Sequence, residues 1–499
     1  KMNKKNQILL KRLILSLALL AGTSKAAIIS SDTQITSSYI DIYAPGPHTV
    51  LGGVKLTFAE NINLSSSNYF ITGGNNVTFL INPNTIITSS SIFISSNYSN
   101  ITIDIYGKVH ANTNAISLGS SASNNTINLN KGSIIIGNII ADGATSDARL
   151  NINLGAGTSY AYSVTGPWIV TDLNNRPMVT GSAYAAGIGN VVTTSQSMYE
   201  RTSQITESID ERARAYNLKQ NTLQDYWINT YYSDSNRGGQ GLSGSNLSFN
   251  QYRSGITAGF KVMNTFTPAE LIMNYEHSTL NIDQGNQGVT SNSIMVGTLF
   301  PDVKKIMNGT LSAKALIGYS DFSGDRKVLT NDVAYDGSRN VTASYQSSHL
   351  TLGSSWTKTL YQTDKMILDT LVGVDLNTQH INAYSESDLF KWNGRTINQL
   401  QERVTLGMEI KPMVNPLTLY GRVGIERRDL LSGENQNYVI NNTSVSYNDS
   451  NQRNTYATLN AGAYYPLTST VKAYAQVKYY DSIKNIDSLS GSIGISGQF

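Results

Sequence analysis

Few side chains in residues 27–189 combine the types and the spacing that catalysis requires. The two histidines of this region, His48 and His110, lie in unrelated sequence contexts, and neither has an obvious partner. A nucleophile needs a base within hydrogen-bond reach, and residues 27–189 contain neither a Gly-Asp-Ser nor a Gly-x-Ser-x-Gly motif. We therefore predict that this region holds no catalytic residue and that the protein is not an enzyme.

Residues with the types and spacing needed to bind a metal ion or a cofactor are also lacking in the sequence. The aspartates Asp41, Asp104, Asp142 and Asp147 are scattered, and the sequence has no EF-hand loop and no nonapeptide calcium repeat. The chain contains no cysteine, which excludes a disulfide framework and every thiolate metal site. We expect no metal ion and no cofactor.

Charged residues with helical spacing occur between residues 190 and 222. The apolar stripe of this segment consists of Met198, Ile205 and Ile209, and it is too narrow to hold a helix onto an ordinary core. A helix over residues 197–216 would be about 30 Å long, close to the thickness of a bilayer's hydrocarbon core. Such a helix needs a polar partner, which the lumen of a β-barrel would provide. The alternative is a solvated linker.

Inward-facing strand residues of opposite charge are the expected partners of this helix. The proposed contacts join Glu200, Glu207, Asp210 and Arg212 on the helix to Arg403, Glu409, Arg422 and Glu426 on the strands. Further members of the two sets are Arg201, Glu211 and Arg214, and Lys314, Lys472 and Lys478.

The strands that would carry these residues alternate apolar and polar side chains with period two. Twelve such segments lie at about 225–233, 252–262, 269–280, 291–300, 309–321, 346–358, 364–377, 400–411, 416–427, 454–465, 470–480 and 488–499. Their connections alternate between long and short, as in outer-membrane barrels with long outer loops and short periplasmic turns. We predict a twelve-stranded barrel over residues 223–499, with a soluble β-sandwich as the alternative.

Aromatic residues near the strand ends are typical of the girdles that flank the apolar band of such a barrel. We assign this position to Trp227, Tyr231, Trp356, Tyr464 and Tyr479.

A repeat of 23 to 25 residues organises the first part of the chain. Asn76-Val77-Thr78 aligns with Asn100-Ile101-Thr102, then with Asn125-Thr126-Ile127, and Arg149-Leu150-Asn151 follows. Short strands at this spacing predict a parallel β-solenoid over residues 27–165, with a stacked ladder of Asn76, Asn100 and Asn125. Residues 166–189 would form a capping segment. The alternative is a low-complexity tract without fixed structure.

The first 26 residues have the pattern of a secretory signal peptide. Basic residues precede an apolar run over residues 13–21, and small residues follow, which places the cleavage site between Ala26 and Ala27. Six of the 37 basic residues and none of the 34 acidic residues lie in this segment, so the remaining chain has 31 basic and 34 acidic groups. This balance gives no support to nucleic-acid binding.

The order of these parts resembles that of monomeric autotransporters of type Va secretion. The chain ends on Phe499, with Ile495, Ile493 and Leu489 at the same parity, which resembles the signal read by the outer-membrane barrel assembly machinery. The resemblance implies an all-β fold: a right-handed parallel β-helix passenger, a pore-plugging α-helix and a 12-stranded antiparallel transmembrane barrel. It also implies export through the Sec translocon, a barrel surrounded by outer-membrane lipid, and a passenger at the cell surface or secreted.

The resemblance leaves the role of the passenger open. Without catalytic motifs, we expect a surface protein for adhesion or aggregation, with a host-cell or self-association surface. A second hypothesis is release of the passenger as a factor acting on host cells, for which Asn174-Asn175 and Asn190 are cleavage candidates by residue type. A third is a vestigial passenger on a barrel that acts as a pore.

Overall fold

The computed structural model describes most of the chain in two units. The described residues are 28–35, 48–66, 71–143, 147–155, 157–171, 178–181, 184–187, 189–218, 225–238, 247–263, 268–283, 286–411, 416–440, 442–448, 453–483 and 485–498. One unit comprises Lys1–Ile188 and Lys327–Asn340, and the other comprises Gly189–Arg326 and Val341–Phe499. The expected signal peptide and its cleavage site at Ala26 and Ala27 lie outside the described residues.

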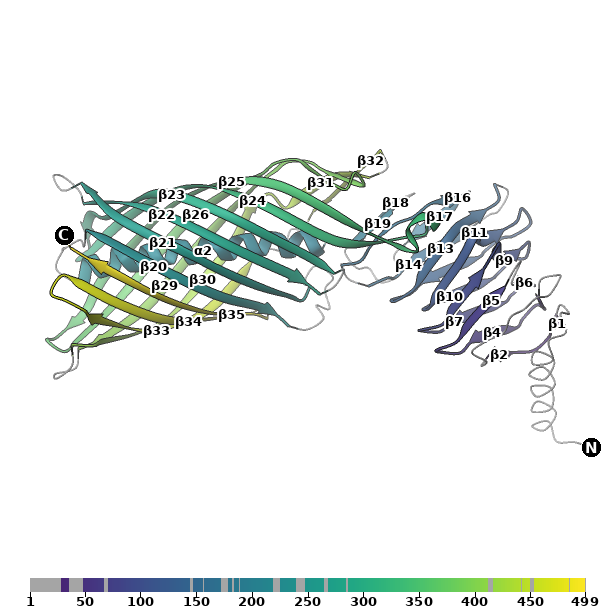
Figure 1. Ribbon diagram of the computed structural model, residues 1–499, viewed down its shortest axis with the longest axis horizontal. Helices are drawn as coiled ribbons and strands as arrows, with labels where there is room; N and C mark the ends of the chain where they lie inside the picture. Colours follow the sequence, from purple (N-terminus) through teal and green to yellow (C-terminus); the bar gives the residue numbers. More distant parts are fainter. Residues whose placement is uncertain are drawn as a thin grey trace, which may run out of the picture. The chain divides into compact units, whose positions relative to one another are not determined.

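The first unit is a parallel β-solenoid built from two sheets (Figure 1). One sheet contains β1 (Ile28–Ile29), β3 (His48–Val50), β5 (Asn63–Ser66), β6 (Ile71–Gly73), β8 (Ile86–Ser89), β9 (Ile92–Ser96), β11 (Lys108–Leu118), β13 (Ile134–Ala141) and β16 (Val164–Thr165). The other contains β2 (Thr33–Ile35), β4 (Lys55–Phe58), β7 (Thr78–Ile81), β10 (Thr102–Ile105), β12 (Thr126–Leu129), β14 (Ala148–Ile152) and β17 (Trp168–Thr171). The predicted solenoid is confirmed.

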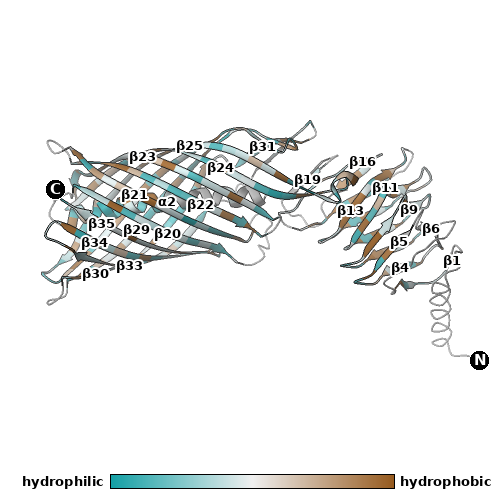
Figure 2. Cartoon of the chain, in the orientation of Figure 1, coloured by the Kyte–Doolittle hydropathy of each residue, from teal (hydrophilic) through white to brown (hydrophobic). Residues whose placement is uncertain are grey.

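Stacked apolar residues fill the interior of the solenoid. Leu56, Phe79, Ile103, Ile127 and Leu150 are register partners on successive strands of the second sheet, and each is buried. The residues between them on each strand face outward, so the strands alternate in hydropathy (Figure 2). Each turn contributes the same apolar positions, which is why a short repeat can build one continuous core.

The asparagine ladder differs from the prediction by one residue on its third rung. Thr102 pairs with Thr126, so the register partner of Asn100 is Asn124 and not Asn125. Asn76, Asn100 and Asn124 all have φ near +55°, a conformation that asparagine tolerates better than most residues. The Asn100 amide donates to Asn76 Oδ1 at 3.0 Å, whereas the buried Asn125 turns inward. Two consecutive asparagines fit the repeat equally well in sequence, and the backbone conformation selects the first.

The solenoid continues past residue 165, its predicted end. β16 pairs in parallel with β13, and β17 pairs in parallel with β14, because Trp168-Ile169-Val170 supplies one further strand. Residues around them form β15 (Ser159–Ala161), β18 (Met178–Gly181) and β19 (Tyr184–Gly187), which pair antiparallel as β18–β19 and β15–β19.

The second unit is an antiparallel barrel closed by its first and last strands. Its twelve strands are β20 (Tyr226–Arg237), β21 (Phe249–Met263), β22 (Ala269–Ile282), β23 (Gln287–Ile306), β24 (Gly309–Thr330), β25 (Ser338–Gln362), β26 (Met366–Ile381), β29 (Arg395–Ile410), β30 (Thr418–Ser432), β33 (Asn454–Pro466), β34 (Val471–Ser482) and β35 (Ile486–Gly497). β20 pairs with β35 from Tyr226↔Gly497 to Arg237↔Ile486. Each strand overlaps one predicted segment, so the strand count is confirmed.

Two long connections of the barrel contain strands that the sequence did not indicate. The predicted connection 378–399 contains β27 (Tyr384–Glu386) and β28 (Phe390–Trp392), and the predicted connection 428–453 contains β31 (Asn435–Ile440) and β32 (Thr443–Asn448). β28 pairs with β31 across the two connections. A short η1 helix (Val333–Tyr335) lies between β24 and β25.

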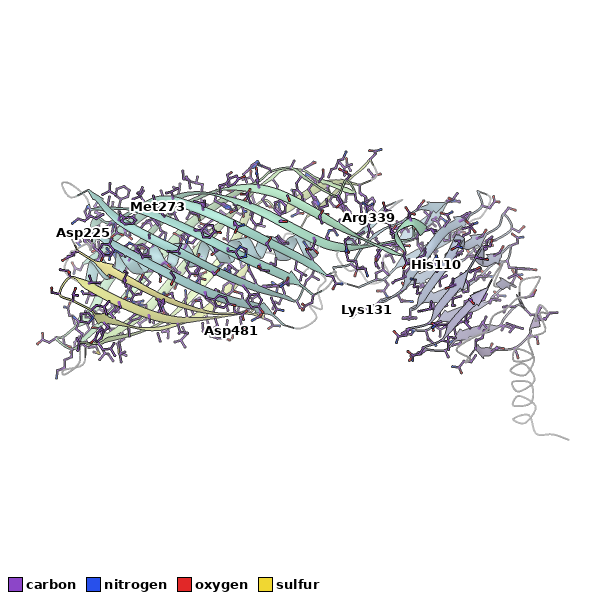
Figure 3. The ribbon with its side chains drawn as sticks, viewed as in Figure 1. His110, Lys131, Asp225, Met273, Arg339 and Asp481 are labelled. Atoms are coloured by element: carbon purple, nitrogen blue, oxygen red, sulfur yellow. The ribbon has the colours of Figure 1, made fainter. Side chains whose placement is uncertain are left out.

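The outer face of the barrel is apolar and the inner face is polar. On β35, Leu489, Ile493 and Ile495 are exposed on the outside, while the alternate serines, including Ser488 and Ser490, are buried. Figure 3 labels Met273, which is likewise exposed on the outer face. This division gives one wall surface to lipid and the other to a polar lumen.

The prediction of an aromatic girdle is wrong for three of the five residues assigned to it. Trp227 and Tyr231 are buried on the inner face of β20, where they donate hydrogen bonds to glutamates, and Tyr464 lines a cavity of the lumen. Tyr479 is exposed on the outer face and Trp356 is half-buried. Position near a strand end does not fix the face, because the parity of the residue along the strand decides it.

One helix, α2 (Gly189–Leu218), precedes the barrel and runs through its ring of strands (Figure 1). Its 30 residues correspond to about 45 Å, so the helix is longer than the predicted 197–216 at both ends. In the described part of the chain, no helix has the length and apolar character needed to cross a membrane.

Candidate functional site

The lumen of the barrel holds α2 by a narrow apolar contact and by ion pairs. Ile205, Ile209 and Ala213 lie one helical turn apart and are completely buried. They pack against apolar residues of the wall, which are Trp227, Ile272, Met295, Leu299 and Leu316. The remaining faces of the helix carry polar and charged side chains, and several of these pair with charged residues of the wall.

Four charged groups meet around Asp210, in the last third of the helix, and we call them the Asp210 group. Lys314 Nζ lies 2.6 Å from Asp210 Oδ1 and 2.9 Å from Asp375 Oδ1. Arg403 Nη1 lies 2.9 Å from Asp210 Oδ2, and Arg403 also pairs with Asp375. Two carboxylates thus face two cations, and only Asp210 comes from α2.

A second group of four, the Glu200 group, lies towards the start of the helix. Arg428 Nη1 is 2.5 Å from Glu200 Oε1, and Arg428 Nη2 is 2.5 Å from Glu426 Oε1. Arg253 Nη2 is 3.9 Å from Glu200 Oε2. This group contains two cations and two carboxylates, and the Ser203 hydroxyl of α2 donates a further hydrogen bond to Glu426 Oε1 at 2.9 Å.

Towards the end of α2, a third group joins the helix to two further strands. Arg214 pairs with Asp369 of β26 and lies 3.4 Å from Glu211 within the helix. Glu211 in turn pairs with Arg422 of β30. This group again contains two cations and two carboxylates.

Two further ion pairs join the helix to the wall. Arg212 Nη2 lies 2.7 Å from Glu270 Oε1, and Glu270 Oε2 accepts a hydrogen bond of 2.8 Å from Trp227. Glu207 pairs with Lys478 and accepts a hydrogen bond from Tyr480.

Balanced charge is what allows these groups to be buried. Removing an ion from water costs several kcal/mol, and only a close partner of opposite charge offsets that cost. Breaking one buried pair by removing a single partner costs about 3–5 kcal/mol. Each of the three ion groups contains as many cations as carboxylates, so the buried charges are balanced within each group.

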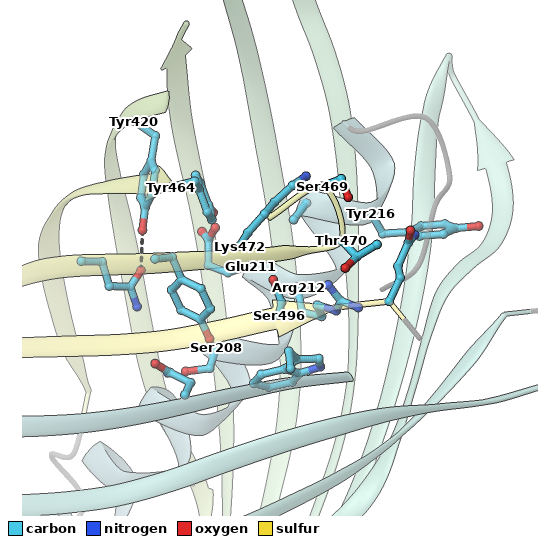
Figure 4. Close-up of a pocket in the computed structure, with 16 residues that line it drawn as sticks. Ser208, Glu211, Arg212, Tyr216, Tyr420, Tyr464, Ser469, Thr470, Lys472 and Ser496 are labelled. Atoms are coloured by element: carbon cyan, nitrogen blue, oxygen red, sulfur yellow. Dashed lines mark hydrogen bonds between the residues drawn. The ribbon is translucent and has the colours of Figure 1, made fainter. Parts of the chain in front are cut away.

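A cavity of about 290 Å³ remains beside the last turns of α2 (Figure 4). Glu211, Arg212 and Tyr216 of the helix line one side, and Tyr420 and Lys472 are among the strand residues on the other. Tyr420 donates to Gln476 at 2.9 Å across the cavity wall. The cavity lies next to the short connection between β33 and β34, so α2 fills the lumen incompletely at that end.

The residues expected in the lumen are largely found there. Glu200, Glu207, Asp210 and Arg212 of α2 each have a partner on the wall, and Arg403, Arg422 and Glu426 are among those partners. Glu409 is buried on the inner face of β29, and Lys472 lines the cavity. The side chain of Arg201 lies outside the described residues. Their role in holding the helix stays a prediction.

Several charged residues of the lumen were not predicted from the sequence. Asp369 and Asp375 occupy inward positions of β26, and Arg253 an inward position of β21. Their parity along the predicted strands was a sufficient signal. Arg428 was assigned to a loop because the predicted ninth strand ended at residue 427, whereas β30 continues to Ser432.

Other expected site residues lie elsewhere. Leu489, Ile493 and Ile495 share the outer face of β35, while Phe499 lies outside the described residues. Asn174 and Asn175 also lie outside them, and Asn190 lies in the first turn of α2. Within the described residues, no three His, Cys, Asp or Glu side chains come together in a way that could hold a metal ion.

Comparisons with known proteins concern mainly the barrel. A family model, "Autotransporter beta-domain", matches residues 226–478. Among solved structures, the translocator domain of the autotransporter NalP from Neisseria meningitidis is 18% identical, with a TM-score of 0.46, over 61% of this chain and 98% of that one. The beta domain of the Bordetella autotransporter BrkA is 14% identical, with a TM-score of 0.42, over 56% and 100%. The transport unit of AIDA-I from Escherichia coli is 9% identical, with a TM-score of 0.39, over 59% and 97%. No curated protein sequence matches the chain.

Proposed function

This chain belongs to the autotransporter β-domain family, and on that premise we propose that its β-solenoid is a passenger for adhesion or self-association. The family model covers more than half of the chain, and the barrel is an outer-membrane secretion domain. The passenger is therefore displayed at the cell surface or secreted. What it does there is the proposal.

The observation that carries this proposal is a regular polar face on the solenoid, where a row of three threonines lies between Lys55 and Arg149. Thr78, Thr102 and Thr126 are register partners and point outward from β7, β10 and β12. Beside them, Asn128 donates to Asp104 Oδ1 at 2.6 Å. Asn151 donates to Asn128 Oδ1 at 2.7 Å, which continues the row onto β14.

Such a face suits contact with another protein surface. Interface cores are depleted of charged residues, since burying an unpaired charge is costly. Residues 27–189 contain only five basic and seven acidic groups, so a second copy of the solenoid or a host protein could cover the face with little charge desolvation. The absence of hydrolase motifs supports a binding role rather than an enzymatic one.

The proposal is tested by displaying the protein on a non-adherent, non-aggregating bacterial host. We expect the wild-type chain to cause cell settling or binding to a host-cell layer, and the double variant Thr102→Lys/Thr126→Lys to lose it. Asn114→Lys/Asn138→Lys is the matched control, because it adds two charges to the other sheet. A wild-type chain that reaches the surface and confers neither settling nor binding would overturn the proposal.

We further propose that α2 closes the lumen after export, through the residues described above. Replacing residues 189–218 by a flexible Gly-Ser linker should raise the single-channel conductance in planar bilayers. Equal conductance of the two proteins would show that α2 is no plug, and a high wild-type conductance would favour a pore function.

Export to this location is proposed to use the Sec translocon and the barrel assembly machinery. Leu489, Ile493 and Ile495 form an apolar outer row on β35, and Phe499 extends that row in the sequence. Deletion of Phe499 should lower the amount of heat-modifiable barrel in outer membranes. An unchanged amount would show that the terminal residue is not part of the assembly signal.

A further inference from the structure

Residues 327–340 lie between two barrel strands in the sequence but belong to the solenoid unit. We call them the hairpin tip. They comprise the end of β24, the η1 helix and the start of β25. A connection that served only to join β24 to β25 would need a few residues, so the association of this segment with the solenoid requires its own explanation.

The backbone of the hairpin tip extends the sheet structure of the solenoid unit. Val328, Leu329 and Thr330 pair in parallel with Ser159, Tyr160 and Ala161 of β15. The side chain of Val328 is completely buried, and Leu329 packs against the solenoid core. The hairpin tip thus supplies both main-chain hydrogen bonds and apolar surface to the last turns.

Asn331 fixes the hairpin tip to the main chain of Gly137 in β13 and of Ser163, which immediately precedes β16. Its side chain is 3% exposed, and its amide nitrogen donates to Ser163 O at 2.7 Å and to Gly137 O at 3.2 Å. Its amide oxygen accepts from Ser163 N at 2.8 Å. The Gly137 N–H also donates to the Asn331 carbonyl at 2.8 Å.

The hairpin tip also covers apolar side chains that point away from the core. Ile136 lies on the outer face of β13 and is nevertheless completely buried. Gly337, with φ of +86°, is packed so closely that a Cβ atom there would lie 2.4 Å from Ile134 Cγ2. At the edge of this contact, Lys108 Nζ pairs with Asp336 Oδ1 at 3.0 Å.

We infer that the hairpin tip is the cap of the passenger's last turns, so that the translocator segment of the chain completes the fold of the passenger. Terminal repeats of a solenoid need a cap because their outer surfaces have no further repeat to cover them. Here Ile134, Ile136 and the polar groups of Gly137 and Ser163 are covered by residues from beyond α2 in the sequence. A solenoid without the hairpin tip would expose these groups.

The first test measures limited proteolysis of the purified full-length protein in detergent. Gly337→Val should make cleavage within residues 134–163 at least tenfold faster, because the new side chain cannot fit against Ile134. Gly238→Val is the matched control, since a Cβ at Gly238 meets no atom within 4 Å. Heat-modifiability on a gel reports separately that the barrel is folded.

Asn331→Ala keeps the test informative if Gly337→Val prevents barrel folding. It should produce the same protease sensitivity, with the exposed Asn382→Ala as its control. Wild-type cleavage rates in Asn331→Ala with a folded barrel would overturn the inference. Because the purified protein is used, failure of surface display or adhesion leaves this result unaffected.

A third variant tests the contact itself. Ala161 and Thr330 are register partners, so their Cα atoms are about 4.8 Å apart, within the range that a disulfide requires. The chain has no cysteine, so oxidation of Ala161→Cys/Thr330→Cys should remove both reactive thiols, as measured with maleimide-PEG. Ala161→Cys/Thr49→Cys should retain both, because four strands of the solenoid sheet separate β3, which contains Thr49, from β16, which follows Ala161 by three residues. Two free thiols in the first variant after oxidation would overturn the inference.

Discussion

Removal of the Asp210 carboxylate should loosen α2 within the barrel. In the wild-type protein Asp210 and Asp375 face Lys314 and Arg403, all four side chains being buried. Asp210→Ala leaves the two cations with one carboxylate. Removing one partner from a buried ion pair costs about 3–5 kcal/mol. Since Asp210 is the only member from α2, this loss falls on the docking of the helix.

Hydrogen–deuterium exchange of α2 measures that loss directly. Amide exchange reports the free energy of local opening, and every 1.4 kcal/mol is about tenfold in an equilibrium constant. We therefore expect amides around residue 210 to exchange about 10²- to 4 × 10³-fold faster in Asp210→Ala. Peptides from β22 and β23 should exchange as in the wild type. Asp481→Ala is the control, because Asp481 is exposed (Figure 3).

A double variant separates charge balance from simple loss of contact. Asp210→Ala/Arg403→Met retains the pair of Lys314 with Asp375, so one cation and one carboxylate remain. Its effect on α2 exchange should be smaller than the sum of the two single effects by more than about 1 kcal/mol. Wild-type exchange of α2 in Asp210→Ala, with the barrel folded, would refute the idea that these ions hold the helix.

Three further predictions concern the solenoid and the lipid-facing wall. Phe79→Ala should destabilise the solenoid by about 3–5 kcal/mol and Ile103→Val by about 0.5–1.5 kcal/mol, measured by urea unfolding and circular dichroism, because both residues are buried in the core. The hydrogen bond and charge of Lys108 lower the pKa of Asp336, with His110 adding a smaller effect. The folded state therefore binds this proton more weakly than the unfolded state. The contribution is fully present above about pH 4 and is lost as the pH falls through the lowered pKa of the folded state. The proteolysis difference between wild type and Asp336→Asn should be seen at pH 7 and should shrink as the pH is lowered below about 4. Ile425→Lys, on the outer face of β30, should lower barrel stability in lipid bilayers by about 2–4 kcal/mol if it lies at the midplane, as measured by urea titration.

The barrel was predictable because apolar and polar residues alternate along each strand, and this alternation distinguishes the outer face from the inner face. Alternation along β29 places Arg403 and Glu409 inside and Val404 and Met408 outside, and the structure agrees. Pairing partners in the lumen were less predictable. The carboxylate that pairs with Arg403 is determined by the rotation of α2 and by the strand register. Neither can be predicted from a local sequence pattern.

The solenoid shows a different limit of sequence reasoning. Its period was recognisable from apolar residues, but Asn124 and Asn125 fit the repeat equally well until backbone conformation distinguished them. The hairpin tip was not foreseen, because Asn331 and Ser163 are 168 residues apart. Contacts between residues so far apart in the sequence arise from the tertiary fold, and the spacing of residue types does not predict them.

Closure of the barrel between β20 and β35 has a topological consequence for α2. Twelve consecutive residue pairs join these strands, and small serines meet on their inner side, with Ser235 and Ser488 hydroxyls 2.7 Å apart. The wall therefore has no free edge through which a helix could slip sideways. Once the last strand has paired with the first, the closed wall surrounds α2, and the helix can leave only along the barrel axis. Weakened ion pairs should therefore loosen α2 within the bore without opening a lateral exit.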